Sequence, residues 1–290
     1  MLGNFEFFAP ESLVEASRLL KEKQDAKIMM GGTDLLILMR TGVLAPSAVV
    51  DLSRVEGIDS ICELPNHYSI GAGVTHAAFC EWALDKPSFR AFYDASASVG
   101  TPQVRNIATV IGNLCNAVPS ADLGAPALIF ECVMKITDAE TEKRVPASSF
   151  FTGPKKTILK QGEIVTGMEF PKLESKYASC YRKFGPRKAS DLATVGVATL
   201  LALDERGYVE DLRIALGAVA PTPILIDIPE GMIGQKYSEE WVQECAQLAS
   251  KLCKPISDFR ASAAYRRHLV AIETVRALRA SAEELFRRSL

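Results

Sequence analysis

The sequence predicts a folded protein of mixed helix and sheet with two domains. Its 290 residues exceed the ~100–200 of a usual domain. Its hydrophobic (48%) and charged (23%) fractions are those of a globular protein. Segments with helical and with strand periodicity alternate along the chain, and near residue 177 they give way to a long hairpin followed by helices. This change predicts a separate α+β domain in the last third.

Two short elements open the first domain. Apolar residues at helical spacing predict a helix that follows Pro10 and ends near Lys23. A short buried strand at residues 27–30 is halted by Gly31 and Gly32, and an apolar run begins at Leu35. Backbone without side chains is therefore expected at the end of a strand.

The remaining elements follow from the same patterns. Thr75 is the expected N-cap of a helix over residues 76–84. Other elements expected in the first domain are strands at residues 48–52 and 68–73, a stretch of small residues and turn formers at 113–130, and a strand at 129–137. The last third predicts strands at 192–203 and 208–220 joined by a four-residue loop, a helix capped by Ser238 and a final helix from about Ala261.

The charge balance excludes several classes of partner. Lys and Arg number 33 against 35 Asp and Glu, giving a net charge of −2 and a pI near 6.0. No global positive field attracts nucleic acid or anionic lipid. No apolar stretch reaches the ~20 residues of a membrane span, and the N-terminus lacks the pattern of a signal peptide. A cytoplasmic protein without membrane span is therefore expected.

The cysteine and histidine counts argue against a metal site in this chain. The seven cysteines are scattered along the chain, and no two of them form a C-x2-C pair. Only three histidines are present. A Walker loop, a G-x-S-x-G elbow and a G-x-G-x-x-G fingerprint are also missing from the sequence. These observations exclude the usual nucleoside triphosphatase, esterase and Rossmann interpretations.

Two glycine-containing segments are candidates for binding an anion such as a diphosphate. Residues 31–34 (Gly-Gly-Thr-Asp) can present consecutive N–H groups where a Cβ would block close approach. Residues 109–116 again offer glycine, hydroxyl and amide groups. The alternatives are a tight turn in which Asp34 caps the next segment, and a structural cluster of turns at 109–116.

The sequence resembles the FAD-binding medium subunits of molybdenum hydroxylases, the family that includes xanthine dehydrogenase and carbon monoxide dehydrogenase. Residues 30–36, Met-Gly-Gly-Thr-Asp-Leu-Leu, are similar to its A-G-G-T-D-L-L loop. Further similar segments follow in family order, at residues 70–76, 105–109, 112–117 with Asp122, 181–183 with 187–188, 191–193, 216–223, 260–262 and 265–267. The resemblance covers essentially the whole chain.

The resemblance implies a fold and a set of cofactor contacts. The fold is a VAO/PCMH-type FAD-binding domain over residues 1–172, with subdomains at about 1–55 and 56–172, followed by the family's α+β flavoprotein C-terminal domain over 173–290. FAD would be bound non-covalently. The residues that match its contacts are Ile28, Met29, Met30, Gly31, Gly32, Thr33, Asp34, Leu35, Leu36, Val99, Thr109, Val110, Ile111, Gly112, Asn113, Asp122, Val165 and Lys183. An ammonium such as that of Lys183 stabilises negative charge on a flavin or its phosphates.

Two residues depart from the family pattern. Met30 stands where the family usually has alanine, which matters little if its side chain points into the core. Ile111 replaces the first glycine of the family's G-G-N, and a β-branched residue tolerates neither positive φ nor a ligand against its Cβ. Ile111 therefore either points away from the flavin or weakens binding.

Other reactive side chains have structural explanations. His76 is expected to be a structural histidine rather than an acid–base catalyst, and Cys115 a buried small hydrophobe rather than a redox thiol. No pair of nucleophile and base can be assembled from the sequence, so no catalytic residue is assigned.

The resemblance implies an oxidoreductase subunit that carries electrons. A large partner would hold molybdopterin, a small partner two [2Fe-2S] clusters, and FAD here would pass electrons to NAD, a quinone or oxygen, in a complex expected to be a dimer of heterotrimers. One alternative is a stand-alone PCMH-type flavin reductase, for which the sequence offers no convincing proton donor. The other is a flavin-free structural subunit. The molybdenum-site substrate is not encoded here.

Overall fold

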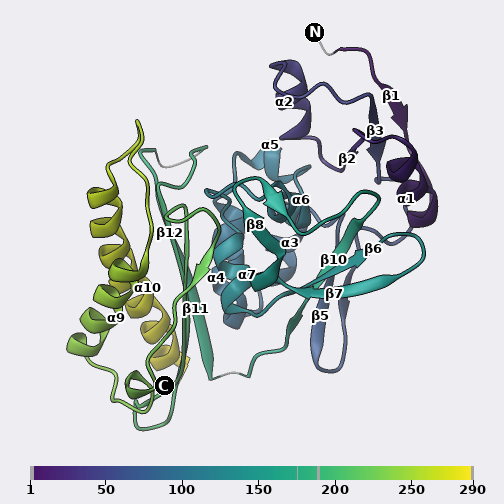
Figure 1. Ribbon diagram of the computed structural model, residues 1–290. Helices are drawn as coiled ribbons and strands as arrows, with labels where there is room; N and C mark the ends of the chain where they lie inside the picture. The colour runs from purple at the N-terminus through teal and green to yellow at the C-terminus, as the bar shows by residue number, and fades with distance from the viewer. Residues whose placement is uncertain (1–2, 175, 188–189, 289–290) are drawn as a thin grey trace.

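The computed structural model describes residues 3–174, 176–187 and 190–288. Within these residues the chain forms three sheets of three or more strands and one two-stranded sheet, with helices packed against them (Figure 1). The first sheet is parallel, in the order β1-β3-β2. Its strands and their two helices are β1 (Glu6–Phe8), α1 (Leu13–Glu22), β2 (Lys27–Met29), α2 (Leu35–Arg40) and β3 (Ala48–Asp51).

The first helix shows how local sequence sets these elements. The Ser12 hydroxyl accepts a hydrogen bond from the Glu15 N–H and so caps α1, while Lys21 lies in the last turn. Ala16 and Leu20 are buried against the sheet. The helix thus begins at Leu13, three residues after the Pro10 expected to open it, and ends one residue before Lys23.

The second sheet is antiparallel, in the order β4-β5-β10-β6-β7, and carries most of the core of the first domain. Phe79, Phe92, Phe130 and Phe170 are fully buried, and Phe92 and Phe130 stack at 5.1 Å between ring centroids. The strands are β4 (Ile61–Glu63), β5 (His67–Gly71), β6 (Val133–Thr137), β7 (Glu142–Pro146) and β10 (Ile164–Pro171), beside a two-stranded sheet of β8 (Phe151–Gly153) and β9 (Lys156–Thr157).

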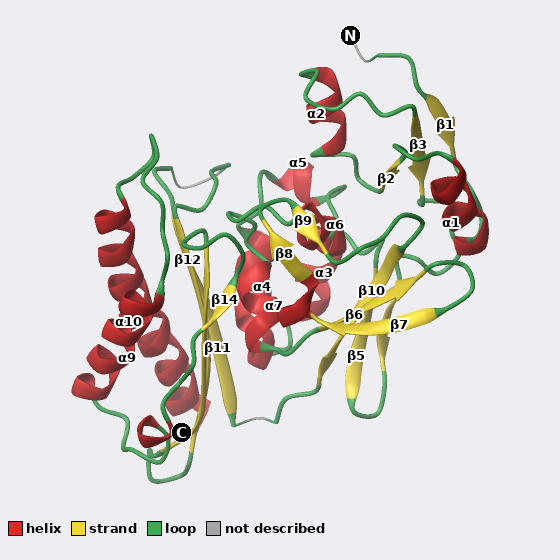
Figure 2. Cartoon of the chain, viewed as in Figure 1, coloured by secondary structure: helices red, strands yellow, loops and turns green. Residues whose placement is uncertain are grey.

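Short helices fill the space between the second and third sheets (Figure 2). They are α3 (His76–Ala83), the 3-10 helix η1 (Pro87–Phe89), α4 (Arg90–Ala97), α5 (Pro102–Arg105), α6 (Val110–Asn116), α7 (Gly124–Ile129) and α8 (Ala147–Phe150). Thr75 caps α3, as the sequence predicts, by accepting from the Ala78 N–H.

The third sheet is enclosed by helices on both faces. Its antiparallel order is β11-β12-β13-β14, with α4 and α7 on one face and α9 and α10 on the other (Figure 1). Ala198, Leu200 and Ala215 join the core of the first domain, whereas Val197 and Leu201 join that of the C-terminal helices. The elements are β11 (Tyr177–Phe184), β12 (Val195–Leu203), β13 (Val209–Gly217), β14 (Ile224–Leu225), the 3-10 helix η2 (Glu230–Met232), α9 (Glu239–Leu252) and α10 (Ala263–Arg288).

The structure corrects several expected elements. The stretch at 113–130 is not a run of turns, because α6 and α7 occupy much of it. The strand expected from residue 129 begins at Val133, since Ile129 ends α7. The hairpin strands are shorter than expected, at Val195–Leu203 and Val209–Gly217, but pair antiparallel around the expected loop. Ser238 caps α9 as predicted, and α10 begins at Ala263.

Within the described ranges, none of the helices combines the length and apolar character needed to cross a membrane. The same part of the chain brings together no group of three or more His, Cys, Asp or Glu side chains that could hold a metal ion.

Candidate functional site

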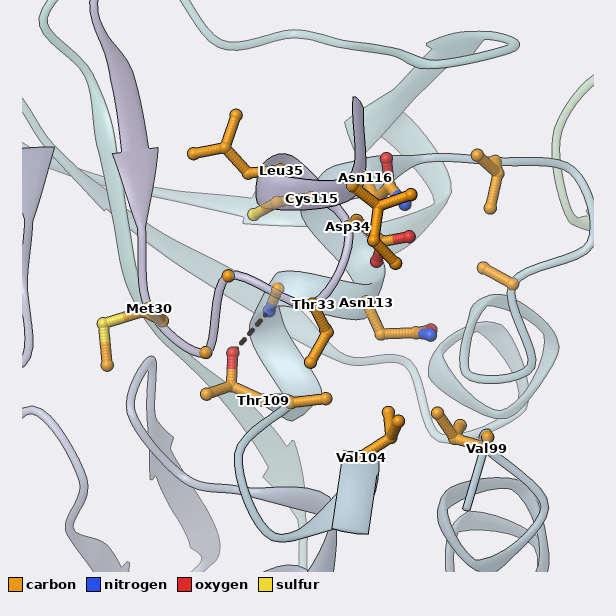
Figure 3. Close-up of a pocket in the computed structure, with 18 of the residues that line it drawn as sticks. Met30, Thr33, Asp34, Leu35, Val99, Val104, Thr109, Asn113, Cys115 and Asn116 are labelled. Carbon is orange, nitrogen blue, oxygen red and sulfur yellow. Dashed lines mark hydrogen bonds between the residues drawn. The ribbon is translucent and has the colours of Figure 1, made fainter. Parts of the chain in front are cut away.

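A cleft of about 1050 Å³ opens between the first domain and loops of the C-terminal domain. One wall is the segment from Lys27 to Leu38, and the wall opposite is α6 with the loop that precedes it (Figure 3). Leu192, Phe259 and Arg260 contribute from the C-terminal domain. The site is therefore assembled from distant parts of the sequence.

Glycine brings the first two walls into contact. A Cβ on Gly31 would lie 1.9 Å from the Ile107 carbonyl oxygen, so a larger residue would push the two loops apart. Gly32 has φ +66°, a conformation that other residues adopt only with strain. Among the described residues, none accepts a hydrogen bond from the backbone N–H of Gly32, Thr33 or Asp34. These donors remain available to an anion in the cleft.

The first turn of α6 forms the second wall. The Thr109 hydroxyl accepts a hydrogen bond from the Gly112 N–H at 3.0 Å, drawn as the dashed line in Figure 3. A Cβ on Gly112 would lie 2.8 Å from that hydroxyl oxygen, so glycine favours this cap. The expected turn cluster is thus a capped helix whose positive end lies at the cleft.

The structure brings together most of the predicted site residues. All but three line the cleft: Ile28, Met29, Met30, Gly31, Gly32, Thr33, Asp34, Leu35, Val99, Thr109, Ile111, Gly112, Asn113, Asp122 and Val165. Leu36 is partly exposed beside Gly32, and Val110 is fully buried in the core. Lys183 lines a second, smaller cavity and does not line the cleft.

Asp122 is a buried carboxylate held by strand β11. Tyr181 donates its hydroxyl to Asp122 Oδ1 at 2.8 Å, and Lys183 Nζ donates to Oδ2 at 2.8 Å. Lys183 also donates to the Ser98 carbonyl at 3.2 Å. Burial raises the pKa of the Asp122 carboxyl, while the Lys183 charge and the hydrogen bonds oppose that rise. Lys183 acts on the cleft through this carboxylate.

Asp34 does not make the cap that its position suggests. It occupies the N-cap position of α2, but its side chain makes no capping hydrogen bond. Its carboxylate instead faces the Asn116 amide across the cleft (Figure 3). Partial desolvation there raises the pKa of Asp34, and Asn116 and Lys155 oppose the rise.

The two departures from the family pattern are accommodated by packing. The Met30 side chain points away from Thr33 and Asp34 and packs against the core (Figure 3). Ile111 is 2% exposed and lies inside α6, where its backbone is helical, so the sequence concern about positive φ does not apply. Ile111 forms part of the cleft wall from within the core.

His76 and Cys115 lie at the cleft without the properties of catalytic groups. His76 is fully buried, and desolvation, with a contribution from Arg105, lowers its pKa to about 4, so its imidazole is neutral. Burial raises the pKa of the Cys115 thiol to about 12, which leaves it protonated. Both observations agree with structural roles.

Several cleft residues were not among those predicted. Asn116 lies in the candidate segment 109–116 but was not among the expected FAD contacts, and Val104 immediately precedes the family-like segment 105–109. Arg260 belongs to a segment similar to the family but was not placed in the site. Leu192 and Phe259 are 49% and 91% exposed apolar residues, and only the packing of the C-terminal domain brings them to the cleft.

The residues present fit an FAD. The cleft is as large as the upper end of small-molecule sites, ~300–1,000 Å³, which suits a dinucleotide. Free backbone N–H groups and the start of a helix suit its diphosphate. An apolar wall that includes Leu35, Val99 and Val165 suits its aromatic rings.

Comparison with known proteins gives two family matches that together span most of the chain. Residues 3–173 match the FAD binding domain in molybdopterin dehydrogenase. Residues 179–281 match the CO dehydrogenase flavoprotein C-terminal domain.

Individual relatives extend over nearly the full length. The xanthine dehydrogenase FAD-binding subunit of Escherichia coli O157:H7 is 30% identical over 266 residues, 91% of each chain. The glyceraldehyde dehydrogenase medium chain of Sulfolobus acidocaldarius is 29% identical over 276 residues, 95% of this chain and 97% of that one.

Solved structures agree with these matches. A chain of carbon monoxide dehydrogenase from Hydrogenophaga pseudoflava superposes with a TM-score of 0.93 at 29% identity, covering 98% of this chain and 99% of that one. A chain of quinoline 2-oxidoreductase from Pseudomonas putida 86 gives 0.91 at 28% identity with the same coverage. Sequence, fold and cleft therefore agree, and the chain belongs to the family of FAD-binding medium subunits of the molybdenum hydroxylases.

Proposed function

We propose that this chain is the electron-transfer subunit of a molybdenum hydroxylase complex. Electrons from a molybdopterin centre in a large partner would reach the cleft through [2Fe-2S] clusters in a small partner and leave to an external acceptor, NAD, a quinone or oxygen. The likeness to medium chains of dehydrogenases supports this assignment. The observation that carries it is the cleft between the two glycine-containing walls.

FAD, when bound, supplies a redox group that can exchange electrons with clusters and with diffusible acceptors. The chain's own residues bind and orient it. The N–H groups of residues 32–34 and the start of α6 would hold its diphosphate, and Asp122, paired with Lys183, would offer a fixed polar group in the wall. Neither His76, which is neutral and buried, nor Cys115 supplies acid–base or nucleophilic chemistry at the cleft.

The proposed complex is a dimer of heterotrimers. Within the described residues the chain has no cluster of metal-ligating side chains, so the iron–sulfur and molybdenum centres are assigned to the partners. The exposed apolar side chains Ile37, Leu192 and Phe259 at the cleft suit a surface that is covered on assembly.

Stopped-flow reduction tests the proposal. The purified flavin-loaded chain is mixed anaerobically with dithionite-reduced small subunit, freed of excess dithionite, and the flavin absorbance is followed. We expect rapid bleaching with the small subunit and none with the same protein stripped of its clusters. An unchanged flavin band with the reduced partner would contradict electron transfer. Steady oxidation of NADPH by the chain alone would favour the stand-alone reductase, and the lack of any flavin band would favour the structural subunit.

A further inference from the structure

A tyrosine that the cofactor assignments leave out holds a key carboxylate of the FAD cleft. Tyr181 lies on β11, two residues before Lys183, and both side chains reach across to Asp122 of the first domain. The Tyr181 ring is 5% exposed and belongs to the core of the first domain, although its strand belongs to the C-terminal sheet.

The neighbouring strand leaves room for this hydroxyl. Gly196 on β12 lies opposite Lys183, and a Cβ on it would come within 2.7 Å of Tyr181 Oη. Because that distance is shorter than real Cβ contacts, any larger residue at 196 would displace the hydroxyl. The glycine thus permits the Tyr181–Asp122 hydrogen bond.

The number of hydrogen bonds that the Asp122 carboxylate can accept indicates the role of Tyr181. An ionised carboxylate offers about four acceptor positions. Tyr181 and Lys183 each take one at 2.8 Å, on different oxygens. These are the groups that act most on the carboxyl, and they fix its plane while leaving acceptor capacity toward the cleft that Asp122 lines.

We propose that Tyr181 is a positioning residue of the FAD site, which orients the Asp122 carboxylate and stabilises its ionised form for contact with the cofactor. The inference rests on FAD binding in the cleft and not on the identity of the electron donor or acceptor. Burial raises the pKa of Tyr181 well above its ordinary value, so its hydroxyl stays protonated and keeps donating. Lys183 places a positive charge beside the Asp122 carboxylate, and the Tyr181 hydrogen bond fixes the orientation of that carboxylate.

The pH dependence of FAD affinity separates this role from simple packing. In Tyr181→Phe the ionised Asp122 loses a donor, so the pKa of that carboxyl rises further. Binding that needs the carboxylate is then lost at a higher pH as the solution is acidified. We expect FAD affinity at pH 7 to fall about tenfold, the effect of one hydrogen bond to a charged group, and the acid limb of the binding curve to move to higher pH.

A double-mutant cycle provides the control for geometry. Gly196→Ala displaces the hydroxyl and should reproduce both effects of Tyr181→Phe. The combined variant should bind FAD no more weakly than Tyr181→Phe alone, because the added methyl then faces a ring without its oxygen. Tyr208→Phe removes a hydroxyl from a 42% exposed tyrosine and should change nothing.

The measurement is FAD dissociation from the full-length apo chain between pH 5 and 8, with circular dichroism to establish folding. Wild-type chain that fails to bind FAD would overturn the cofactor assignment itself. If the wild-type chain binds FAD but the acid limb of the binding curve does not move in folded Tyr181→Phe, the positioning role alone is overturned. Additive losses in the combined variant would assign the effect to packing rather than to the hydrogen bond.

Discussion

At the scale of single residues, contact between two backbones defines the cleft. Gly31 packs against the Ile107 carbonyl, and residue 107 leads within two positions to the Thr109 cap of α6. The glycines therefore set the distance between the anion-binding walls, while the neighbouring N–H groups stay open. We expect a side chain added at one of these glycines to disturb the cleft more than it disturbs the fold.

Gly32→Val is expected to abolish FAD binding in a protein that still folds. The substitution adds bulk within 2.9 Å of Leu36 and forces a β-branched residue into φ +66°. Gly42→Val is the matched control, since Gly42 has φ +74° with open space around it. Both variants should lose stability of ~1–2 kcal/mol, but only the first should lose flavin. Full FAD occupancy in Gly32→Val would contradict the assignment of this loop.

Ile111→Gly is expected to destabilise the fold without improving FAD binding. Ile111 is 2% exposed within the core, so its loss should cost roughly 1–4 kcal/mol from the cavity left behind. Thermal unfolding and FAD dissociation are measured together on the same protein. A variant that is more stable and binds FAD more tightly would show that the isoleucine crowds the cofactor.

At the scale of elements, the starts of α3 and α6 are joined. Thr75 and Thr109 form an isolated antiparallel bridge, and each caps its own helix through its hydroxyl. The His76 N–H donates to the Ala108 carbonyl, and the Val110 N–H donates to the Val74 carbonyl. The position of α6 in the cleft therefore depends on α3.

The two caps form a matched pair for a test. Thr109→Ala and Thr75→Ala should each cost about 1 kcal/mol of stability, the usual worth of an N-cap. Because only Thr109 lines the cleft, FAD affinity should fall severalfold more in Thr109→Ala. Calorimetry on the apo chains compares the stabilities, and flavin titration compares the affinities. Equal losses of affinity would mean that the cap acts only through the fold.

The buried histidine at the start of α3 predicts a loss of stability in acid. The pKa of His76 is lowered from 6.5 to about 4 in the folded chain, so the unfolded chain binds the extra proton between those values. Stability from this group is therefore present above pH 6.5 and falls as the pH drops toward 4. From pH 7 to 5 the loss is about 2 kcal/mol.

Urea unfolding of His76→Gln at pH 7 and 5 checks this effect. The variant should lose about 2 kcal/mol less than wild type over that range. An unchanged pH dependence in His76→Gln would show that His76 is not the titrating group.

Elements with local signals could be predicted, and those set by tertiary packing could not. The N-cap residues Thr75 and Ser238 predict the starts of their helices from the sequence. By contrast, α7 contains Gly124 and Pro126, which have poor helix propensity, and its place depends on packing such as that of Gly124 against Pro223. Strand β10 carries Gly167 at a bulge, where a Cβ would lie 2.3 Å from a carbonyl oxygen of β5.

At the scale of the whole molecule, the parts of the site formed by continuous stretches of sequence could be predicted. The parts that come from contact between the two domains could not. The segments at 28–36 and 109–113 are local motifs, and all of their residues except Leu36 and Val110 line the cleft. Phe259 lies at the cleft in a loop that is anchored by Arg266 of α10. Arg266 fixes that loop by donating to the Asp258 carboxylate and to the carbonyls of Thr194 and Ala218. Such long-range anchoring has no signature in sequence periodicity.

FAD is expected to be held without a covalent bond. Among the described residues that line the cleft are one histidine, His76, and one cysteine, Cys115; the first is fully buried, and burial keeps the thiol of the second protonated. Acid precipitation of the flavin-loaded chain should leave the yellow colour in the supernatant. Colour retained in the pellet after washing would refute the non-covalent assignment.

The helix-covered sheet of the C-terminal domain has a kinetic consequence. Because Ala198, Leu200 and Ala215 are buried in the first domain while the opposite face is buried under α9 and α10, swinging the domains apart would expose apolar surface at ~25 cal/mol per Å². Exchange of the cofactor with solvent must therefore proceed through local movement of the loops at the cleft mouth. Its release rate should follow substitutions in those loops and remain insensitive to changes that loosen the outer helices.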